Sequence, residues 1–344
     1  MKAQAIRAAK RRVTVAVVSV LAMVLVAMLA GCGISGGLGW AADGPPVQLA
    51  VPKAAPPATV PIARVLPAGH GVPIGVYETA FPDNPTAGSA FAADVGVKPR
   101  MLVYFSSWGE RFVTTFAAAA HSNGAVPVVQ IEPNNIPLSG IISGQYDTYL
   151  RQYALAVRLY RYPVILSFGH EMNGYWYSWG NTNSAPAQFI AAWRHVVTVF
   201  RAVGATNVKW LWAVNNFLPG QTTGQKTVSG DIKQWWPGQK WVDLVGIDGY
   251  YYTTGLTFDS VFGPAITAIR KITSEPLMIA ETAVGTTADR ETQISGLLAG
   301  AKADNLFGII WFDAAQNSGL YHQNWSLEAD PVAAAALKAA VAST

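Results

Sequence analysis

Cysteine is almost absent from this chain of 344 residues, which contains one, Cys32. A single cysteine excludes a disulfide framework within the chain. Histidine is also scarce, with five residues. A zinc-protease motif would need a second histidine at the fourth position after His170, and that position is Gly174. We therefore expect neither a metal nor another cofactor.

Charged residues are few, at 13% of the chain, and the formal net charge is +4. Five of the 24 basic residues lie within the first 12 positions, which contain no acidic residue. Without that start, 19 basic residues stand against 20 acidic ones. The basic balance therefore does not indicate a nucleic-acid partner. The rest of the chain is close to neutral, which suits a neutral polymer as substrate.

The beginning of the chain has the features of an export signal. Basic residues are followed by an apolar run over 13–30, and Leu29-Ala30-Gly31-Cys32 resembles the lipobox of bacterial lipoproteins. We expect residues 1–31 to be a lipoprotein signal peptide and Cys32 to carry a lipid. The protein would then be exported and anchored to the outer face of the cytoplasmic membrane, or be extracellular. A plain anchor helix and a twin-arginine signal at Arg11-Arg12 are the alternatives.

A proline-rich segment follows, with seven prolines between Trp40 and His70. Such a segment buries little apolar surface, and its prolines favour an extended conformation. We expect residues 32–71 to be a linker and residues 72–343 to form one catalytic domain, acting as a monomer.

Short apolar runs alternate with helical patterns throughout this domain. Runs that are uniformly apolar indicate strands buried on both faces, as in parallel sheets covered by helices. Eight such strands predict a (β/α)8 TIM barrel, and a doubly wound open sheet is the alternative. The expected strands are 72–77, 100–105, 125–131, 163–168, 208–214, 242–247, 276–280 and 307–312. The expected helices are 110–122, 146–160, 187–203, 260–273, 290–303 and 331–341.

Polar residues gather just after these strands, where a barrel of this kind carries its active site. The fourth strand leads into His170-Glu171, and the seventh into Glu281. Glu132 follows the third strand, and Tyr250 lies just beyond the sixth. Two carboxylates surrounded by aromatic residues are the groups that cleave glycosidic bonds.

Several of these motifs also carry a resemblance. The segment His170-Glu-Met-Asn-Gly174, Trp176, the segment Gly246-Ile-Asp-Gly-Tyr250 and Ile279-Ala-Glu281 together resemble glycoside hydrolase family 26. The likeness extends over most of residues 72–325. Members of that family are retaining (β/α)8 enzymes, mainly endo-β-1,4-mannanases.

The resemblance implies roles for the two glutamates. Glu171 would be the acid/base that protonates the leaving oxygen, and Glu281 the nucleophile that attacks the anomeric carbon. Retention requires the two carboxyl groups to lie roughly 5–5.5 Å apart. Because like charges repel, we expect Glu171 to stay protonated near neutrality while Glu281 is ionised.

Five further residues are predicted to bind substrate. By the resemblance, His170 contacts the attacked sugar, Tyr250 hydrogen-bonds the nucleophile, and Trp176 and Trp311 stack on sugar rings. Glu132 is expected to accept hydrogen bonds from sugar hydroxyls, with a structural Glu-Pro turn as the alternative. A buried core histidine and a packing tyrosine are the alternatives for His170 and Tyr250.

We therefore predict a retaining endo-β-glycanase that hydrolyses β-1,4-mannan-type polysaccharide. A β-1,3-1,4-glucanase or a β-xylanase with the same mechanism is the first alternative. A non-catalytic carbohydrate-binding lipoprotein is the second, but it would be free to lose one carboxylate, and both are present. A solute-binding lipoprotein would need a second α/β lobe, and the strand spacing shows none.

Overall fold

Eight parallel strands close into a barrel in the computed structural model, which describes residues 55–66, 71–217, 222–223, 226–316 and 323–344. Around the barrel the order is β1-β2-β3-β4-β5-β8-β9-β10, and β10 pairs with β1. The strands are β1 (Ile74–Glu78), β2 (Met101–Ser107), β3 (Val126–Glu132), β4 (Val164–Phe168), β5 (Val208–Asn215), β8 (Leu244–Asp248), β9 (Leu277–Thr282) and β10 (Ile309–Asp313). The predicted (β/α)8 barrel is confirmed, and all eight expected strands are present.

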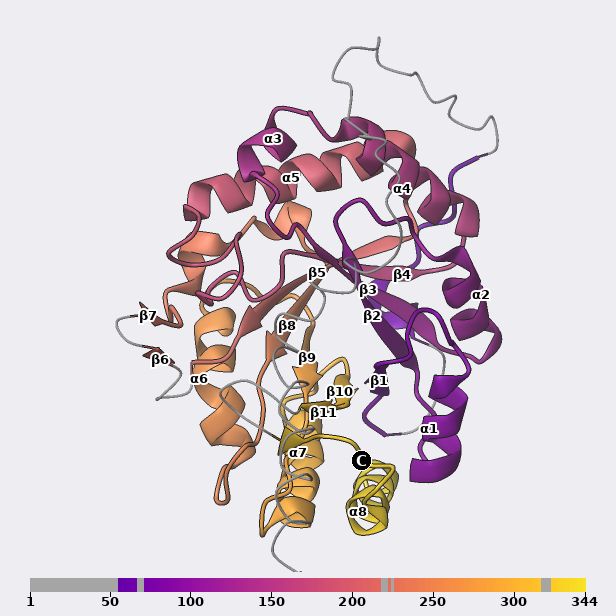
Figure 1. The fold of residues 1–344 in the computed structure, drawn as a ribbon, viewed down its shortest axis with the longest axis vertical. Coiled ribbons are helices and arrows are strands. Elements are labelled where there is room, and N and C mark those ends of the chain that lie inside the picture. Colours follow the sequence, from indigo (N-terminus) through magenta and orange to yellow (C-terminus); the bar gives the residue numbers. More distant parts are fainter. Residues whose placement is uncertain (1–54, 67–70, 218–221, 224–225, 317–322) are drawn as a thin grey trace, which may run out of the picture.

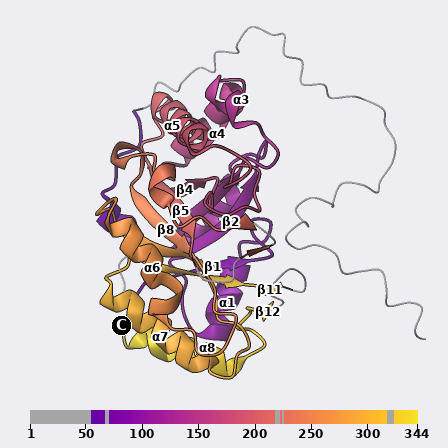
Figure 2. The ribbon, with the colours of Figure 1, turned by 90° about the vertical axis from the view of Figure 1, so that its left-hand side faces the viewer.

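Helices form the outer layer around these strands (Figure 1). They are α1 (Ala87–Val95), α2 (Thr114–Ser122), α3 (Leu138–Ile142), α4 (Asp147–Tyr160), α5 (Pro186–Val203), α6 (Phe258–Arg270), α7 (Arg290–Ala303) and α8 (Pro331–Ala342). Figure 2 shows α3, α4 and α5 together at one side of the barrel, with α6, α7 and α8 at the other. The C-terminal helix α8 packs against both α7 and α1, so it joins the end of the chain to its first helix.

Two helices were not predicted from the sequence. The helix α1 has only two large apolar residues, Phe91 and Val95, which are too few for a clear helical pattern, and α3 is only five residues long. Short elements also decorate the loops. They are the 3-10 helices η1 (Ile62–Arg64), η2 (Ile232–Trp235) and η3 (Gln239–Trp241), and the strand pairs β6 (Thr222–Thr223) with β7 (Lys226–Thr227) and β11 (Ala315–Gln316) with β12 (Gln323–Asn324).

Two apolar layers hold the fold together. The inner layer fills the barrel with alternate residues of the strands, including Met101, Val128, Ile165 and Leu211. The outer layer lies between the barrel and the helices, and it contains most of the tryptophans. Because side chains along a strand alternate between the two faces, the layer to which a residue belongs decides whether it reaches the barrel mouth.

Part of the expected linker packs on the barrel. Residues 55–66 are described, and within them Val65 is 4% exposed and belongs to the inner apolar layer. Val60, Ile62 and Leu66 pack against the same layer. Thr206 also donates a hydrogen bond to the carbonyl of Pro57. This stretch therefore differs from the extended linker that we expected over 32–71, because its apolar side chains find space at the barrel.

The predicted signal peptide, residues 1–31, and Cys32 lie outside the described residues. Within the part of the chain that the structure describes, no helix combines the length and the apolar character that crossing a membrane requires.

Candidate active site

Polar side chains converge at the end of the barrel where the strands finish. Glu132, Asn215 and Asp248 are the last residues of β3, β5 and β8, and each continues the inward-facing alternation of its strand. Glu171 follows β4, and Glu281 lies near the end of β9. The opposite end of the barrel is apolar. The structure therefore places every predicted carboxylate of the site at one rim.

Glu171 has an unusual backbone conformation. Its φ is +52°, in the left-handed region that a side chain rarely adopts, and Gly169 just before it has a φ of +59°. The Glu171 amide donates a hydrogen bond of 2.9 Å to the carbonyl of Ala213 on β5, which anchors this turn. Such a conformation costs of order 1–3 kcal/mol and is found mainly at functional sites. Its effect here is to turn the carboxyl group into the barrel mouth.

Two side chains hold the Glu171 carboxyl group. The side-chain amide of Asn215 donates to Glu171 Oε1 at 2.6 Å, and the indole N–H of Trp176 donates to Glu171 Oε2 at 2.8 Å. Glu171 is buried, whereas Trp176 is half-buried and keeps part of its ring accessible. The predicted residues Glu171 and Trp176 therefore meet, and both carboxyl oxygens have fixed positions.

Asn173 and Asn215 form a support that was not predicted. Asn173 Nδ2 donates to the backbone carbonyls of Asn215 and Ser229, and its Oδ1 accepts from the backbone N–H of Asn215. Asn215 is thereby fixed before it reaches Glu171. Both asparagines stand in conspicuous positions of the sequence, one in the motif after Glu171 and one at a strand end. What the sequence lacks is any sign that the two contact each other.

A β-bulge directs Glu281 into the barrel. On β8 one step leads from Ile247 to Asp248, whereas on β9 their partners are Ile279 and Glu281, two residues apart. The register with β10 shifts at the same place. Because Ala280 already faces the interior, an unbroken strand would turn Glu281 outward. The extra residue reverses this, and the hydroxyl group of Tyr250 donates a short hydrogen bond to Glu281 Oε1.

The two glutamates influence each other's protonation. Burial raises the pKa of Glu171, and the hydrogen bonds from Asn215 and Trp176 oppose this. Burial, and then the charge of Glu171, raise the pKa of Glu281 to about 8, against the opposing bond from Tyr250. Because the second of two like charges forms less easily, the pair holds a proton across the neutral range. This differs from the expected ionised Glu281, because burial raises the pKa of both groups.

His170 lies behind the rim and not on it. It is 1% exposed, and its Nε2 is 3.0 Å from the hydroxyl oxygen of Tyr177 and 4.0 Å from Glu132 Oε1. Burial lowers the pKa of His170 to about 3, so the ring is neutral. Burial also raises the pKa of Glu132 to about 7. His170 therefore lies beneath the surface of the site, where its ring positions Tyr177, which is half-buried. Its contact with sugar stays a prediction.

The structure corrects the prediction for Trp311. Its side chain is 1% exposed in the outer apolar layer, and its indole donates to the carbonyl of Trp325 at 3.0 Å. A ring buried in this way cannot stack on a sugar. The neighbouring Phe312 has the inward orientation instead, and its ring stacks on Tyr77 with the centroids 4.5 Å apart. Phe312 and Tyr77 are both half-buried at the rim.

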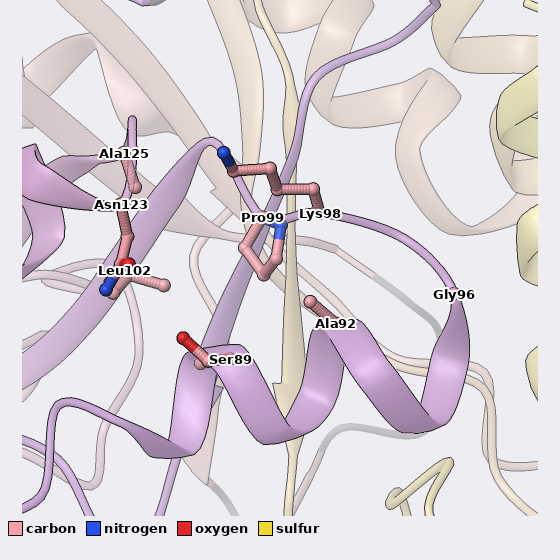
Figure 3. A pocket seen from close by; sticks show the side chains of 9 residues that line it. Ser89, Ala92, Gly96, Lys98, Pro99, Leu102, Asn123 and Ala125 are labelled. Atoms are coloured by element: carbon pink, nitrogen blue, oxygen red, sulfur yellow. The ribbon is translucent and has the colours of Figure 1, made fainter.

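A pocket elsewhere in the domain is separate from this site. It lies between α1 and the segment that leads into β2 (Figure 3). Its lining includes Ser89 and Ala92 of α1, Lys98 and Pro99 before β2, and Asn123 after α2. These residues precede β2 and β3, so the pocket lies toward the ends where the strands begin and does not belong to the candidate site.

A closed parallel barrel with paired carboxyl groups at the ends of its strands defines a class of hydrolytic enzymes. The particular family follows from comparison with known proteins. The model of glycosyl hydrolase family 26 matches residues 148–330, which include both glutamates. The chain therefore belongs to glycosyl hydrolase family 26.

Known proteins are similar to this chain in sequence, and a solved structure shares its fold. Endoglucanase H of Acetivibrio thermocellus is 30% identical over 79% of this chain, which spans 30% of the endoglucanase. A mannan endo-1,4-β-mannosidase of Bifidobacterium adolescentis is 26% identical over 48% of this chain, which spans 16% of that protein. The solved Cellulomonas fimi endo-β-1,4-mannanase double mutant shares the fold, with a TM-score of 0.59, 19% identity, and coverage of 77% of this chain and 70% of its own.

Proposed function

We propose that this chain is a retaining endo-β-glycanase, with Glu171 as acid/base and Glu281 as nucleophile. The observation that carries the proposal is the pair itself. Two carboxyl groups face one barrel mouth, and each is held by its own hydrogen-bond donors, Asn215 and Trp176 for Glu171 and Tyr250 for Glu281. Two carboxyl groups at one end of the barrel are the groups that a retaining mechanism uses as acid/base and nucleophile.

The proposed reaction has two steps. In the first, a carboxylate oxygen of Glu281 bonds to the anomeric carbon while the glycosidic bond breaks, and the proton of Glu171 passes to the leaving oxygen. In the second, Glu171 takes a proton from water. The water oxygen bonds to the anomeric carbon, and the Glu281 carboxylate leaves. Tyr250 and Trp176 hold the two carboxyl groups in position through these steps.

Product stereochemistry tests this mechanism. Two displacements at the same carbon return the configuration of the substrate, so proton NMR in the first minutes of digestion should show the β-anomer before mutarotation. An initial α-anomer would mean inversion, a carboxyl separation of about 6.5–9.5 Å, and a wrong role for at least one glutamate. Glu281→Ala serves as the control, because without a nucleophile the folded protein should release no product.

The substrate that we propose is a β-1,4-mannan-type polysaccharide, as the sequence motifs suggested. A second candidate is a β-glucan, which is favoured by the similarity to a protein named endoglucanase over 79% of this chain. A reducing-sugar assay on mannan, glucomannan, barley β-glucan and β-1,3-xylan separates the candidates. Activity on barley β-glucan alone would exclude the mannan proposal. No activity on any of them would favour a carbohydrate-binding protein.

We also propose that the enzyme is exported and held at the membrane by a lipid on Cys32. The proposal rests on the sequence Leu29-Ala30-Gly31-Cys32, because residues 1–54 are outside the described part. Stable anchoring requires more than one acyl chain, as a lipobox cysteine provides after processing. Cys32→Ser should release the domain into the medium or leave it unprocessed. A variant that stays membrane-bound and is processed normally would contradict the proposal.

A further inference from the structure

Three carboxyl groups lie together outside the active site. Glu78 and Asp313 are the last residues of β1 and β10, which pair directly and close the barrel. Glu328 belongs to the turn between β12 and α8. Each residue offers one carboxylate oxygen, and these oxygens all lie within 4.8 Å of one another. The cluster therefore spans the seam between the first and last strands of the barrel.

These carboxyl groups belong to the outer side of the barrel. Tyr77 and Phe312, the residues just before Glu78 and Asp313, face the barrel mouth, so the next residue along each strand points the other way. The charge of Asp94, on the outer helix α1, also acts on Glu78. These three carboxyl groups therefore do not point into the barrel mouth and cannot bind a sugar there.

Two of the three carboxyl groups are buried without sufficient partners. Glu78 is 7% exposed and Asp313 3% exposed. Glu78 Oε1 and Asp313 Oδ2 accept no hydrogen bond from a described N–H or hydroxyl group, whereas Asp313 Oδ1 accepts from the Leu327 amide at 2.7 Å. The two carboxyl groups lie within hydrogen-bonding reach of each other, so they have each other and no other donor at these oxygens. Burying a carboxylate without a partner costs several kcal/mol, so such a group calls for a cation or a proton.

The charges near this cluster are negative. Those that act on Glu78 come from Asp313, Glu328 and Asp94, and all of them disfavour its ionisation. Burial, together with these charges, raises the pKa of Glu78 to about 9. The nearby guanidinium group of Arg290 is paired with Asp330 at 2.8 Å. A bound cation would compensate three carboxylates that no described basic side chain neutralises.

We propose that Glu78, Asp313 and Glu328 form a binding site for a hard divalent cation, with Ca²⁺ as its ligand. The donors are all oxygen atoms, without the nitrogen or sulfur that zinc and copper favour. Ca²⁺ tolerates irregular geometry and completes its shell of six to eight oxygens with water and carbonyl groups, whereas Mg²⁺ demands a near-ideal octahedron. Three protein carboxylates, one of them exposed, correspond to a weak site with a Kd on the order of 10⁻⁴–10⁻³ M.

The cation would act on stability and not on the reaction. It would join β1 to β10 where the barrel closes, and join both strands to the turn that precedes α8. Because the site lies outside the barrel mouth, this proposal does not depend on the proposed glycanase activity. Its consequence is that the folded domain should be more stable in millimolar Ca²⁺ than after chelation.

Calcium titration of the intact protein tests the proposal directly. Isothermal titration of chelator-treated protein with CaCl₂ should show one site, and 10 mM CaCl₂ should raise Tm while equal MgCl₂ raises it less. Glu328→Gln removes an exposed ligand without disturbing the core and should weaken Ca²⁺ binding by at least about tenfold, the smaller end of the loss seen when a metal's supporting residues are removed. Glu78→Gln should abolish the rise in Tm.

Glu291→Gln is the matched control, because this exposed glutamate lies on α7, outside the cluster. It should bind Ca²⁺ like the wild type. If the wild type binds no Ca²⁺, or if Glu328→Gln and Glu291→Gln bind it equally, the proposal is wrong. A Glu78→Gln variant that is as stable in EDTA as the wild type in CaCl₂ would show that Glu78 and Asp313 share a proton instead.

Discussion

Replacing Glu171 should move the pH dependence of Glu281 in a predictable direction. Three causes raise the pKa of Glu281 from 4.5 to about 8: burial, which is the largest, then the charge of Glu171, and last the charge of Glu132. Glu171→Gln removes only the second cause. The pKa of Glu281 in this variant should therefore lie between 4.5 and about 8, below its wild-type value but above that of an ordinary glutamate.

The direction in which the pH profile shifts depends on which form of Glu281 reacts. Only the ionised carboxylate attacks, so activity falls as the pH drops through its pKa. Glu171→Gln should shift this acid limb to lower pH. Tyr250→Phe should shift it to higher pH, because the hydrogen bond from Tyr250 lowers the pKa of Glu281. The two variants therefore move the same limb in opposite directions.

Dinitrophenyl β-glycosides provide the assay, since their leaving group departs without protonation. For such substrates kcat/KM reports the first chemical step and the pKa of the free enzyme. The limb is measured between pH 4 and pH 9.5 for the wild type, the two variants and Glu291→Gln as an exposed control. An unchanged or raised limb in Glu171→Gln would refute the coupling between the two carboxyl groups.

Three further predictions concern residues around the barrel. Asn215→Ala should lower kcat/KM on polysaccharide by on the order of a hundredfold, because Asn215 holds the Glu171 carboxyl group in position. It should also move the alkaline limb of the pH profile to higher pH, because the hydrogen bond from Asn215 lowers the pKa of Glu171, and normal kinetics would contradict both expectations. Trp176→Phe should raise KM for polysaccharide about tenfold, whereas Trp311→Phe should lower Tm and leave KM unchanged. The reverse pattern would mean that Trp311, and not Trp176, binds the substrate. Val65→Ala should lower the free energy of unfolding by about 2 kcal/mol in denaturant titration, and no loss would mean that residues 55–66 do not pack on the barrel.

The sequence was sufficient for the barrel because its strands are uniformly apolar and end in polar residues. It was not sufficient for α1, whose small residues leave only Phe91 and Val95 to mark the buried face. Val65 stands in a proline-rich stretch where composition indicates a linker. Its burial depends on space left at the barrel, which only the assembled strands define.

The positions of Glu171 and Glu281 were predicted, but not how they reach the barrel mouth. An unbroken alternation along β9 would turn Glu281 outward, and the bulge that reverses it leaves no trace in the residue types. The same alternation explains the error at Trp311, since a one-residue difference in facing exchanges Trp311 for Phe312. Asn173 and Asn215 were visible as polar residues, but their mutual hydrogen bonds depend on the turn after β4.

The packing of residues 55–66 limits how far the catalytic barrel can stand from a membrane. If Cys32 carries the lipid, 22 residues, 33–54, separate it from the packed stretch. Fully extended, they span at most roughly 80 Å, at up to 3.6 Å per residue. A catalytic domain tethered by this linker would reach only polymers that come within that distance of the cell surface. Its supply of substrate would then depend on how the polysaccharide approaches the membrane, and a longer linker should extend the distance over which it digests polysaccharide.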